Sequence, residues 1–343
     1  MKAVLLRRSE KAFRAVLEEV PVPEIGPGEM LVEMKACGLC GTDLEKIKGE
    51  YTASAPVVGH EAVGLASVVG EGVLGFSKGD RVFPHHHVPC GECYYCTHGD
   101  LAMCDDYRKS NLYPCGFSEF IRVPEWNVAR GGVLHVPGDL DLETASFIEP
   151  VACCIRALDR CEVGSGDSVL VSGAGPVGMS HAILLSDLGA EVTVSDVVDG
   201  RLDFVRSSGL ATAADARSPG FAEEIRRRTA GRGVDVGIVA SGSVRAVAQT
   251  LRAVRKGGKL CLFGIPAKGS TLDYDVSDVY NADISIIPSY GATEAETARA
   301  VKAVAKQKDR FASLITHRFP LAEFDAAVKT ASAGSAMKVV VMP

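Results

Sequence analysis

The spacing of apolar and polar residues divides the chain into two regions. In residues 1 to about 150, short segments such as 28–35 and 61–69 alternate apolar and polar positions and lie among glycines and prolines. A period of two is typical of strands that bury one face. This region is therefore predicted to be an antiparallel β domain with irregular loops.

From residue 167 onward, strand-like segments alternate with segments of helical period. Strands are predicted at 168–172, 191–195, 234–240 and 259–263. Helices are predicted at 177–188, 201–207 and 244–254. This alternation is the sequence form of a parallel sheet with crossover helices. Beyond an apolar segment at 284–288, helices are predicted at 294–306 and 321–332 and a last strand at 337–341.

Length and charge narrow the class of protein. A chain of 343 residues is long enough for two domains. Its 37 basic and 43 acidic residues leave a net charge of −6, which argues against binding to nucleic acid or to a membrane surface. The apolar runs are far shorter than the roughly 18 residues of a spanning helix, and the N-terminus is unlike a secretory signal. A cytoplasmic protein is expected.

A glycine motif lies where the first strand of the second region meets its helix. Gly173, Gly175 and Gly178 form the pattern G-x-G-x-x-G, and Asp196 follows at the tip of the next strand. This context favours a pyrophosphate site at the helix N-terminus over glycines that serve only a tight turn. The acid favours NAD over NADP, and Arg201 softens that preference. The cofactor-binding residues predicted here are Gly173, Gly175, Pro176, Val177, Gly178, Asp196 and Arg201.

Four of the eleven cysteines lie close together in the sequence. Cys90, Cys93, Cys96 and Cys104 have the spacing C-x2-C-x2-C-x7-C, which lets four thiolates converge on one tetrahedral ion. An all-cysteine set leaves no open position, so the predicted zinc is structural. An iron–sulfur cluster fits less well because the spacing matches neither common ferredoxin run, and unliganded thiols so close together would oxidise readily.

A second set of ligand types is spread over three segments. Cys37 and Cys40 lie in the first, His60 and Glu61 in the second, and Glu149 just before the nucleotide region. A thiolate, an imidazole and a carboxylate make a three-ligand site with one position open for a substrate. Taken singly, such residues are more often part of a core than ligands.

These motifs, together with the glycine motif, resemble those of a known family. Cys40-Gly-Thr-Asp43 and Gly59-His-Glu-Ala-Val-Gly64 are similar to the catalytic motifs of the zinc-dependent medium-chain dehydrogenases, which include alcohol, sorbitol and threonine dehydrogenases. The resemblance implies an α/β protein with a GroES-like, mainly-β catalytic domain formed by 1–150 and 289–343. A Rossmann domain with a doubly wound parallel sheet is expected at 151–288.

The same resemblance assigns ligands to the catalytic zinc. It implies Cys40 as a ligand, which leaves Cys37 as a packing residue, and it implies His60 as a second ligand. Either Glu61 or Glu149 binds the metal directly while the other holds a water. The motifs leave that choice open.

Further residues are expected to handle protons and substrate. Thr42 is implied as the acceptor of the hydroxyl proton, and Glu45 stands where many members of the family have a histidine that relays protons to solvent. The relay either uses Glu45 or runs through Thr42, the cofactor ribose and water alone. His87 matches a histidine near the substrate in threonine-dehydrogenase-like members, whereas His85 and His86 are expected to be solvated loop residues.

The implied reaction is the reversible oxidation of a secondary alcohol to a ketone, with zinc polarising the oxygen and NAD accepting the hydride. Residues at the ends of two later strands should line the nicotinamide, namely Ala240, Ser241, Phe263, Gly264 and Ile265. Carboxylates near the zinc favour polyols, sugars, cyclitols or their amino derivatives, and butanediol and threonine stay open. The family implies two zinc ions per chain and a homodimer or homotetramer.

Two rival functions stand against this one. The zinc-free quinone-reductase branch of the same fold lacks both metal motifs, so zinc content separates it from the zinc enzymes. A non-catalytic NAD or zinc sensor would need neither Thr42 nor the full nucleotide site. The residues therefore favour an enzyme.

Overall fold

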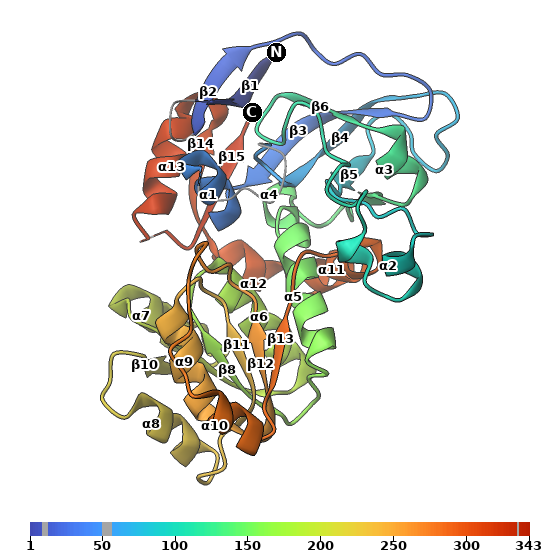
Figure 1. Cartoon of the computed structure of the whole chain (residues 1–343). Helices are drawn as coiled ribbons and strands as arrows, with labels where there is room; N and C mark the ends of the chain where they lie inside the picture. The colour runs from blue at the N-terminus through green and yellow to red at the C-terminus, as the bar shows by residue number, and fades with distance from the viewer. Residues whose placement is uncertain (9–12, 50–56, 335) are drawn as a thin grey trace. The chain divides into compact units, whose positions relative to one another are not determined.

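The computed structural model describes residues 1–8, 13–49, 57–334 and 336–343 (Figure 1). Its internal contacts separate two compact units, Met1–Ala152 with Gly291–Pro343 and Cys153–Tyr290. Among the described residues, no helix is both long enough and apolar enough to cross a membrane.

The first unit is built on a seven-stranded sheet with the order β14-β15-β3-β4-β5-β7, in which β6 also pairs with β3. Its strands are β3 Met30–Gly38, β4 Glu61–Val69, β5 Arg81–Pro84, β6 Phe120–Val123, β7 Val133–His135, β14 Ile315–Pro320 and β15 Lys338–Met342. β1 Lys2–Arg8 and β2 Phe13–Glu19 form a separate antiparallel pair. The predicted mainly-β domain is confirmed, although β14 and β15 pair in parallel.

Short helices connect these strands. They are α1 Gly41–Lys48, α2 Tyr94–Thr97, η1 Leu101–Met103, α3 Glu125–Ala129, α4 Leu142–Ala145, α11 Glu294–Lys306, α12 Lys308–Ser313, η2 Leu321–Glu323 and α13 Phe324–Ser332. α5 Ile148–Arg160 begins in the first unit and continues into the second. The predicted helix 294–306 coincides with α11, which starts at a capping box of Thr293 and Glu296. The predicted helix 321–332 is divided into η2 and α13.

Alternate residues of β3 form the core of the first unit. Met30, Val32 and Met34 are buried together with Phe117 and Phe324, whose rings lie 4.9 Å apart. Because a shift of one residue would turn this apolar set away from the core, the burial pattern fixes the register of β3 against its neighbours.

The second unit contains a six-stranded parallel sheet with the order β10-β9-β8-β11-β12-β13. Its strands are β8 Ser168–Ser172, β9 Glu191–Asp196, β10 Thr212–Asp215, β11 Val234–Val239, β12 Val254–Leu262 and β13 Ser285–Pro288. Its helices are α6 Pro176–Leu188, α7 Asp199–Ser208, α8 Phe221–Arg228, α9 Val244–Ala253 and α10 Val276–Asn281. α8 and α9 lie side by side (Figure 1).

The strand order determines where this unit can bind a ligand. The chain runs outward from β8 to β10 and then crosses back to β11 on the other side of β8. The carboxyl ends of β8 and β11 therefore lie at the switch point at which doubly wound sheets bind nucleotides. The predicted Rossmann fold is confirmed.

Candidate functional site

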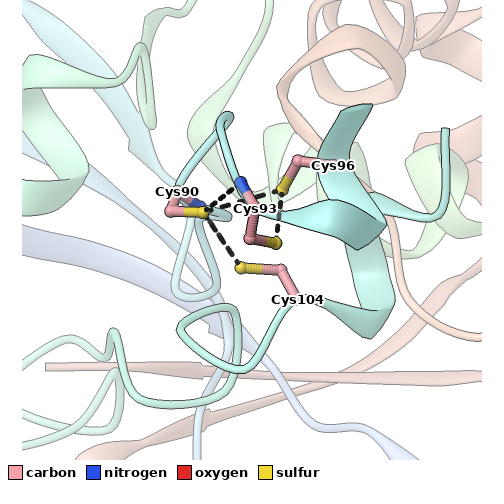
Figure 2. A group of neighbouring side chains, drawn as sticks. All are labelled: Cys90, Cys93, Cys96 and Cys104. Atoms are coloured by element: carbon pink, nitrogen blue, oxygen red, sulfur yellow. Dashed lines mark hydrogen bonds between the residues drawn. The ribbon is translucent and has the colours of Figure 1, made fainter. Parts of the chain in front are cut away.

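The four clustered cysteines converge in the structure (Figure 2). Cys93 precedes α2 and Cys104 follows η1, so two short helical turns bring distant positions together. The Sγ atoms of Cys90 and Cys96 are 3.9 Å apart, and those of Cys93 and Cys96, and of Cys104 and Cys90, are 3.6 Å apart. Four sulfurs at about 2.3 Å from one zinc lie about 3.8 Å from one another, so the donor set fits a tetrahedral zinc.

Backbone groups support a thiolate at Cys90, whereas burial raises the pKa of Cys96 to about 12. The amide of Cys93 donates to Cys90 Sγ at 3.3 Å, and the amide of Cys90 donates to Cys104 Sγ at 3.4 Å. Hydrogen bonds from the backbone of Glu92 and Cys93 lower the pKa of Cys90 to about 7. Because zinc binds the thiolate, a lowered pKa favours metal binding.

A second cluster joins Cys40, His60 and Glu61, whose ligand atoms all lie within 4.8 Å of one another. The pairing of β3 with β4 explains this convergence. Gly38 at the end of β3 is opposite Glu61 at the start of β4, so the segments that follow and precede these strands meet. Glu149, near the start of α5, brings its Oε2 to 4.0 Å from His60 Nε2. The structure thus brings Cys40, His60 and Glu61 together, and places Glu149 beside His60.

Asp43 orients the histidine of this cluster. Its Oδ1 lies 3.4 Å from His60 Nδ1, which leaves Nε2 toward Glu149. The fully buried carboxylate also accepts hydrogen bonds from the amide of Gly59 at 2.9 Å and the amide of Cys40 at 3.1 Å. Burial raises the pKa of Asp43, but His60 and these amides outweigh burial and lower it. The sequence motif includes Asp43, but this positioning role was not predicted from it.

Lys338, the first residue of β15, forms a buried ion pair with Glu61. Its Nζ also donates to the carbonyl of Leu39 at 3.4 Å. Gly38 makes room for this pair, because a Cβ there would lie 1.9 Å from Glu61 Oε2 and 2.8 Å from Lys338 Cε. No sequence motif pointed to Lys338. Its ammonium group lies against Glu61, one of the two glutamates that are candidate zinc ligands.

The two predicted proton-handling residues both lie on α1, directly after Cys40. Thr42 is partly exposed. Glu45 is 41% exposed and forms an ion pair with Lys48 at 3.5 Å. The helix therefore carries Glu45 to the surface of its unit.

The expectation of a solvated loop residue is wrong for His85. His85 is fully buried, and its Nδ1 lies 3.2 Å from Glu294 Oε1 at the start of α11. His86 is partly exposed, and its ring centre is 5.2 Å from that of His60. His87 is 6% exposed, and its Nδ1 lies 3.0 Å from the carbonyl of Ser110. Burial lowers the pKa of His87 to about 3 and lowers that of His86 well below its usual range, so both rings are neutral.

The glycine motif forms a turn that opens onto α6. Gly173 has a φ of +113°, which favours glycine. A Cβ at Gly178 would lie 1.8 Å from the carbonyl oxygen of Gly173, so only glycine allows the helix to pack this closely. A Cβ at Gly175 would meet nothing nearer than Arg201 Nη1 at 3.9 Å, which leaves open space at the helix N-terminus. Pro176 and Val177 begin the helix itself. This geometry fits a pyrophosphate.

Asp196 ends β9 beside this turn. Its carboxylate accepts hydrogen bonds from the amides of Ala174 and Val197 at 2.7 Å and from the amide of Val198 at 3.0 Å. Arg201 Nη1 lies 3.5 Å from Asp196 Oδ2. The carboxylate is thus held at the strand tip, where a ribose of a bound dinucleotide would lie.

The predicted nicotinamide-side residues also gather at this edge of the sheet. A Cβ on Gly173 would lie 3.4 Å from the carbonyl oxygen of Ala240, and one on Gly264 would lie 2.3 Å from the carbonyl carbon of Ser241. The ends of β8, β11 and β12 are therefore in contact. Phe263 is partly exposed, and Ile265 is 48% exposed.

Comparisons with known proteins point to one family for this chain. The model of the alcohol dehydrogenase GroES-like domain matches residues 26–133, and that of zinc-binding dehydrogenases matches residues 176–306. The sorbitol dehydrogenase of Halalkalibacterium halodurans is 31% identical over 350 residues, covering 100% of this chain and 99% of the relative. An L-threonine 3-dehydrogenase of Idiomarina loihiensis is 30% identical over 331 residues, covering 94% of this chain and 95% of the relative. A candidate zinc-binding dehydrogenase of Sinorhizobium meliloti bound to NADP has a TM-score of 0.88 at 27% identity, with 100% of this chain and 99% of that chain covered.

The chain belongs to the zinc-dependent medium-chain dehydrogenases. The predicted fold and the predicted class of enzyme, a zinc-dependent alcohol oxidoreductase, are confirmed. A nicotinamide cofactor and zinc come with this class.

Proposed function

We propose that this protein interconverts a secondary alcohol and its ketone, with a catalytic zinc at the second cluster and NAD as the hydride acceptor. The observation that carries the proposal is the convergence of Cys40, His60, Glu61 and Glu149 from three separate segments. One thiolate, one imidazole and one carboxylate leave a fourth position for the substrate oxygen. When bound, zinc supplies Lewis-acid polarisation of that oxygen.

Residues of the chain supply orientation and proton transfer. Asp43 holds His60 so that Nε2 is available as a ligand. Thr42, two residues after Cys40, accepts the substrate's hydroxyl proton as it gives its own hydroxyl proton to the carboxylate of Glu45, which releases it to solvent from its exposed position beside Lys48.

The third protein ligand is assigned to Glu149. Lys338 already balances the charge of Glu61, whereas zinc gains most from a carboxylate whose charge it does not share with an ammonium group. Glu61 then holds a water molecule or replaces Glu149 as the third ligand. The zinc content of Glu149→Gln and Glu61→Gln tests which glutamate is the ligand. We expect the larger loss of zinc in Glu149→Gln, and a larger loss in Glu61→Gln would make Glu61 the ligand.

NAD supplies the hydride acceptor when bound. The glycine turn of 173–178 would hold its pyrophosphate and the carboxylate of Asp196 its adenosine ribose. The negative charge of Asp196 disfavours a 2′-phosphate, although Arg201 partly neutralises it. We therefore assign preference to NAD, even though the Sinorhizobium meliloti relative was solved with NADP.

A second zinc is assigned to Cys90, Cys93, Cys96 and Cys104, where it has a structural role. The domain boundaries proposed from the sequence, 1–150 with 289–343 and 151–288, differ from the two compact units by two residues at each join. None of the eleven cysteines, all of which lie in the described part of the chain, forms a disulfide, which suits a reducing compartment such as the cytoplasm.

The proposed substrates are polyols, sugars, cyclitols or their amino derivatives. Glu61 and Glu149 provide carboxylates that accept hydrogen bonds from neighbouring hydroxyl or ammonium groups. The names of the two relatives, a sorbitol and a threonine dehydrogenase, support substrates with a second polar group beside the alcohol.

A homodimer or homotetramer is proposed, with one subunit interface at the edge of the second sheet. β13 is its last strand, and Ile286 on this strand is 40% exposed, with Val276 and Tyr280 of α10 exposed at 77% and 84%. An unpaired edge with apolar side chains favours pairing with a second copy. Ile286→Lys should shift the protein toward monomer in sedimentation, and an unchanged mass would reject this edge.

The function is tested by following NAD reduction across polyols, sugars, aminocyclitols, butanediol and threonine, with and without a zinc chelator. Turnover of one class that the chelator abolishes is the expected result. Turnover that survives complete removal of zinc contradicts the proposal.

A further inference from the structure

The three consecutive histidines after β5 differ in how their rings are used. Nδ1 of His85 is engaged by Glu294, and Nδ1 of His87 is engaged by the carbonyl of Ser110. Nδ1 of His86 is buried and has no hydrogen-bond partner among the described residues. Nε2 of His85 is also buried without a partner among the described residues, so the feature that distinguishes His86 is its partly exposed ring.

The ring of His86 lies beside that of His60, one of the candidate zinc ligands. Its ring centre is 5.2 Å from that of His60, with the two planes inclined by 43°. On its other side the ring packs on His87 at 3.9 Å. The ring is partly exposed, so a small molecule can reach it.

The backbone around His86 holds this position. The side-chain amide of Asn127 donates to the carbonyl of His85 at 2.8 Å, and Ser110 Oγ donates to the carbonyl of His86 at 3.3 Å. Asn127 is fully buried. A ring fixed in this way is preorganised to meet a ligand.

We propose that His86 forms a hydrogen bond with a second hydroxyl of the substrate, on the carbon next to the one that is oxidised. An imidazole offers two ring nitrogens to a ligand, and because Nδ1 of His86 is buried, the substrate hydroxyl meets Nε2. Since His60 is a candidate ligand of the zinc that holds the reacting oxygen, a group beside His60 reaches the neighbouring carbon rather than a distant end of the substrate. His86, rather than His87, then selects vicinal diols over simple secondary alcohols. This inference rests on the proposed function.

The test compares the vicinal diol that the panel shows to be turned over fastest with the analogue that lacks the neighbouring hydroxyl. His86→Phe keeps a flat ring and removes both nitrogens, and His86→Gln restores a hydrogen-bonding group. We expect kcat/KM for the diol to fall about five- to tenfold relative to that for the analogue in His86→Phe, the size of one hydrogen bond, and to recover partly in His86→Gln. His317→Phe, at a partly exposed histidine whose ring lies nearly parallel to that of Phe319, is the matched control and should leave the ratio unchanged.

Binding gives a readout that does not depend on turnover. Calorimetric titration of the zinc-loaded protein with the same diol, without NAD, should show the dissociation constant rising by a similar factor in His86→Phe and little change for the analogue. If that variant does not fold, His86→Met takes its place. An equal loss for diol and analogue overturns the role of His86 while leaving the proposed function intact, whereas zinc-independent turnover overturns the proposed function itself.

Discussion

Replacing Lys338 by methionine isolates the buried ion pair at the edge of the metal cluster. Lys338 and Glu61 are 3% and 1% exposed at their side chains. Methionine preserves most of the apolar volume and removes the ammonium group. Glu61 then loses its nearest cation, and its carboxylate either stays charged away from water or takes up a proton.

The cost of protonating Glu61 sets the loss of unfolding free energy in Lys338→Met. A glutamate with an unfolded-state pKa of about 4.3 costs about 3.7 kcal/mol to protonate at pH 7 and about 1 kcal/mol at pH 5. The free energy of unfolding of the zinc-free variant should therefore fall by about 3.7 kcal/mol at pH 7 and by about 1 kcal/mol at pH 5. The sign follows because burial raises the pKa of Glu61, so the folded variant binds a proton that the unfolded chain releases, and stability is lost as pH rises.

Urea denaturation at the two pH values measures this difference. Trp126 is the single tryptophan of the chain, it lies in the same unit, and its Nε1 donates to the carbonyl of Val88 at 3.0 Å. Its fluorescence therefore reports unfolding of the unit that contains the ion pair.

The matched control is Lys35→Met, which removes an exposed ion pair with Glu33 in the same unit, with side chains 37% and 42% exposed. Exposed pairs contribute at most about 1 kcal/mol, so this variant should change little at either pH. A loss in Lys338→Met that is no larger than in the control, or that is equal at both pH values, refutes the reasoning about Glu61.

Three further variants test the metal and nucleotide sites. Cys93→Ser should lower bound zinc by one ion per chain in elemental analysis and reduce thermal stability, and unchanged zinc would reject the structural site. Gly178→Ala should weaken NAD binding about tenfold in a fluorescence titration, because the Cβ would lie 1.8 Å from Gly173 O. Gly200→Ala, where a Cβ meets nothing within 4 Å, is its control, and equal effects would contradict the packing argument. Asp196→Ala should raise kcat/KM for NADP relative to NAD about tenfold, and a constant ratio would remove the ribose contact.

The helix and strand predictions that were confirmed rest on local patterns of apolar and polar residues. The alternation of strands and helices after residue 167 predicted the parallel sheet, since buried central strands such as β8 read as short apolar runs. The capping box at Thr293 belongs to a helix whose bounds were predicted from periodicity alone. Short polar strands, by contrast, left no such pattern, and β10 and β14 were not predicted.

The features that sequence reasoning missed depend on long-range contacts. Lys338 pairs with Glu61 across 277 positions of the chain, and nothing near either residue signals the other. His86 occupies what reads as a polar loop, but hydrogen bonds from Asn127 and Ser110 hold its segment against the core. Asp43 was within reach of prediction, because it ends the motif that begins at Cys40.

Turnover and zinc content of Cys40→Ser, measured side by side with the unaltered protein on the same alcohol, test whether a zinc held by Cys40 and His60 carries out alcohol oxidation apart from the four-cysteine site. We expect complete loss of turnover, with one zinc ion lost per chain and the fold retained. Activity retained in this variant would show that the zinc at Cys40 is not the catalytic one.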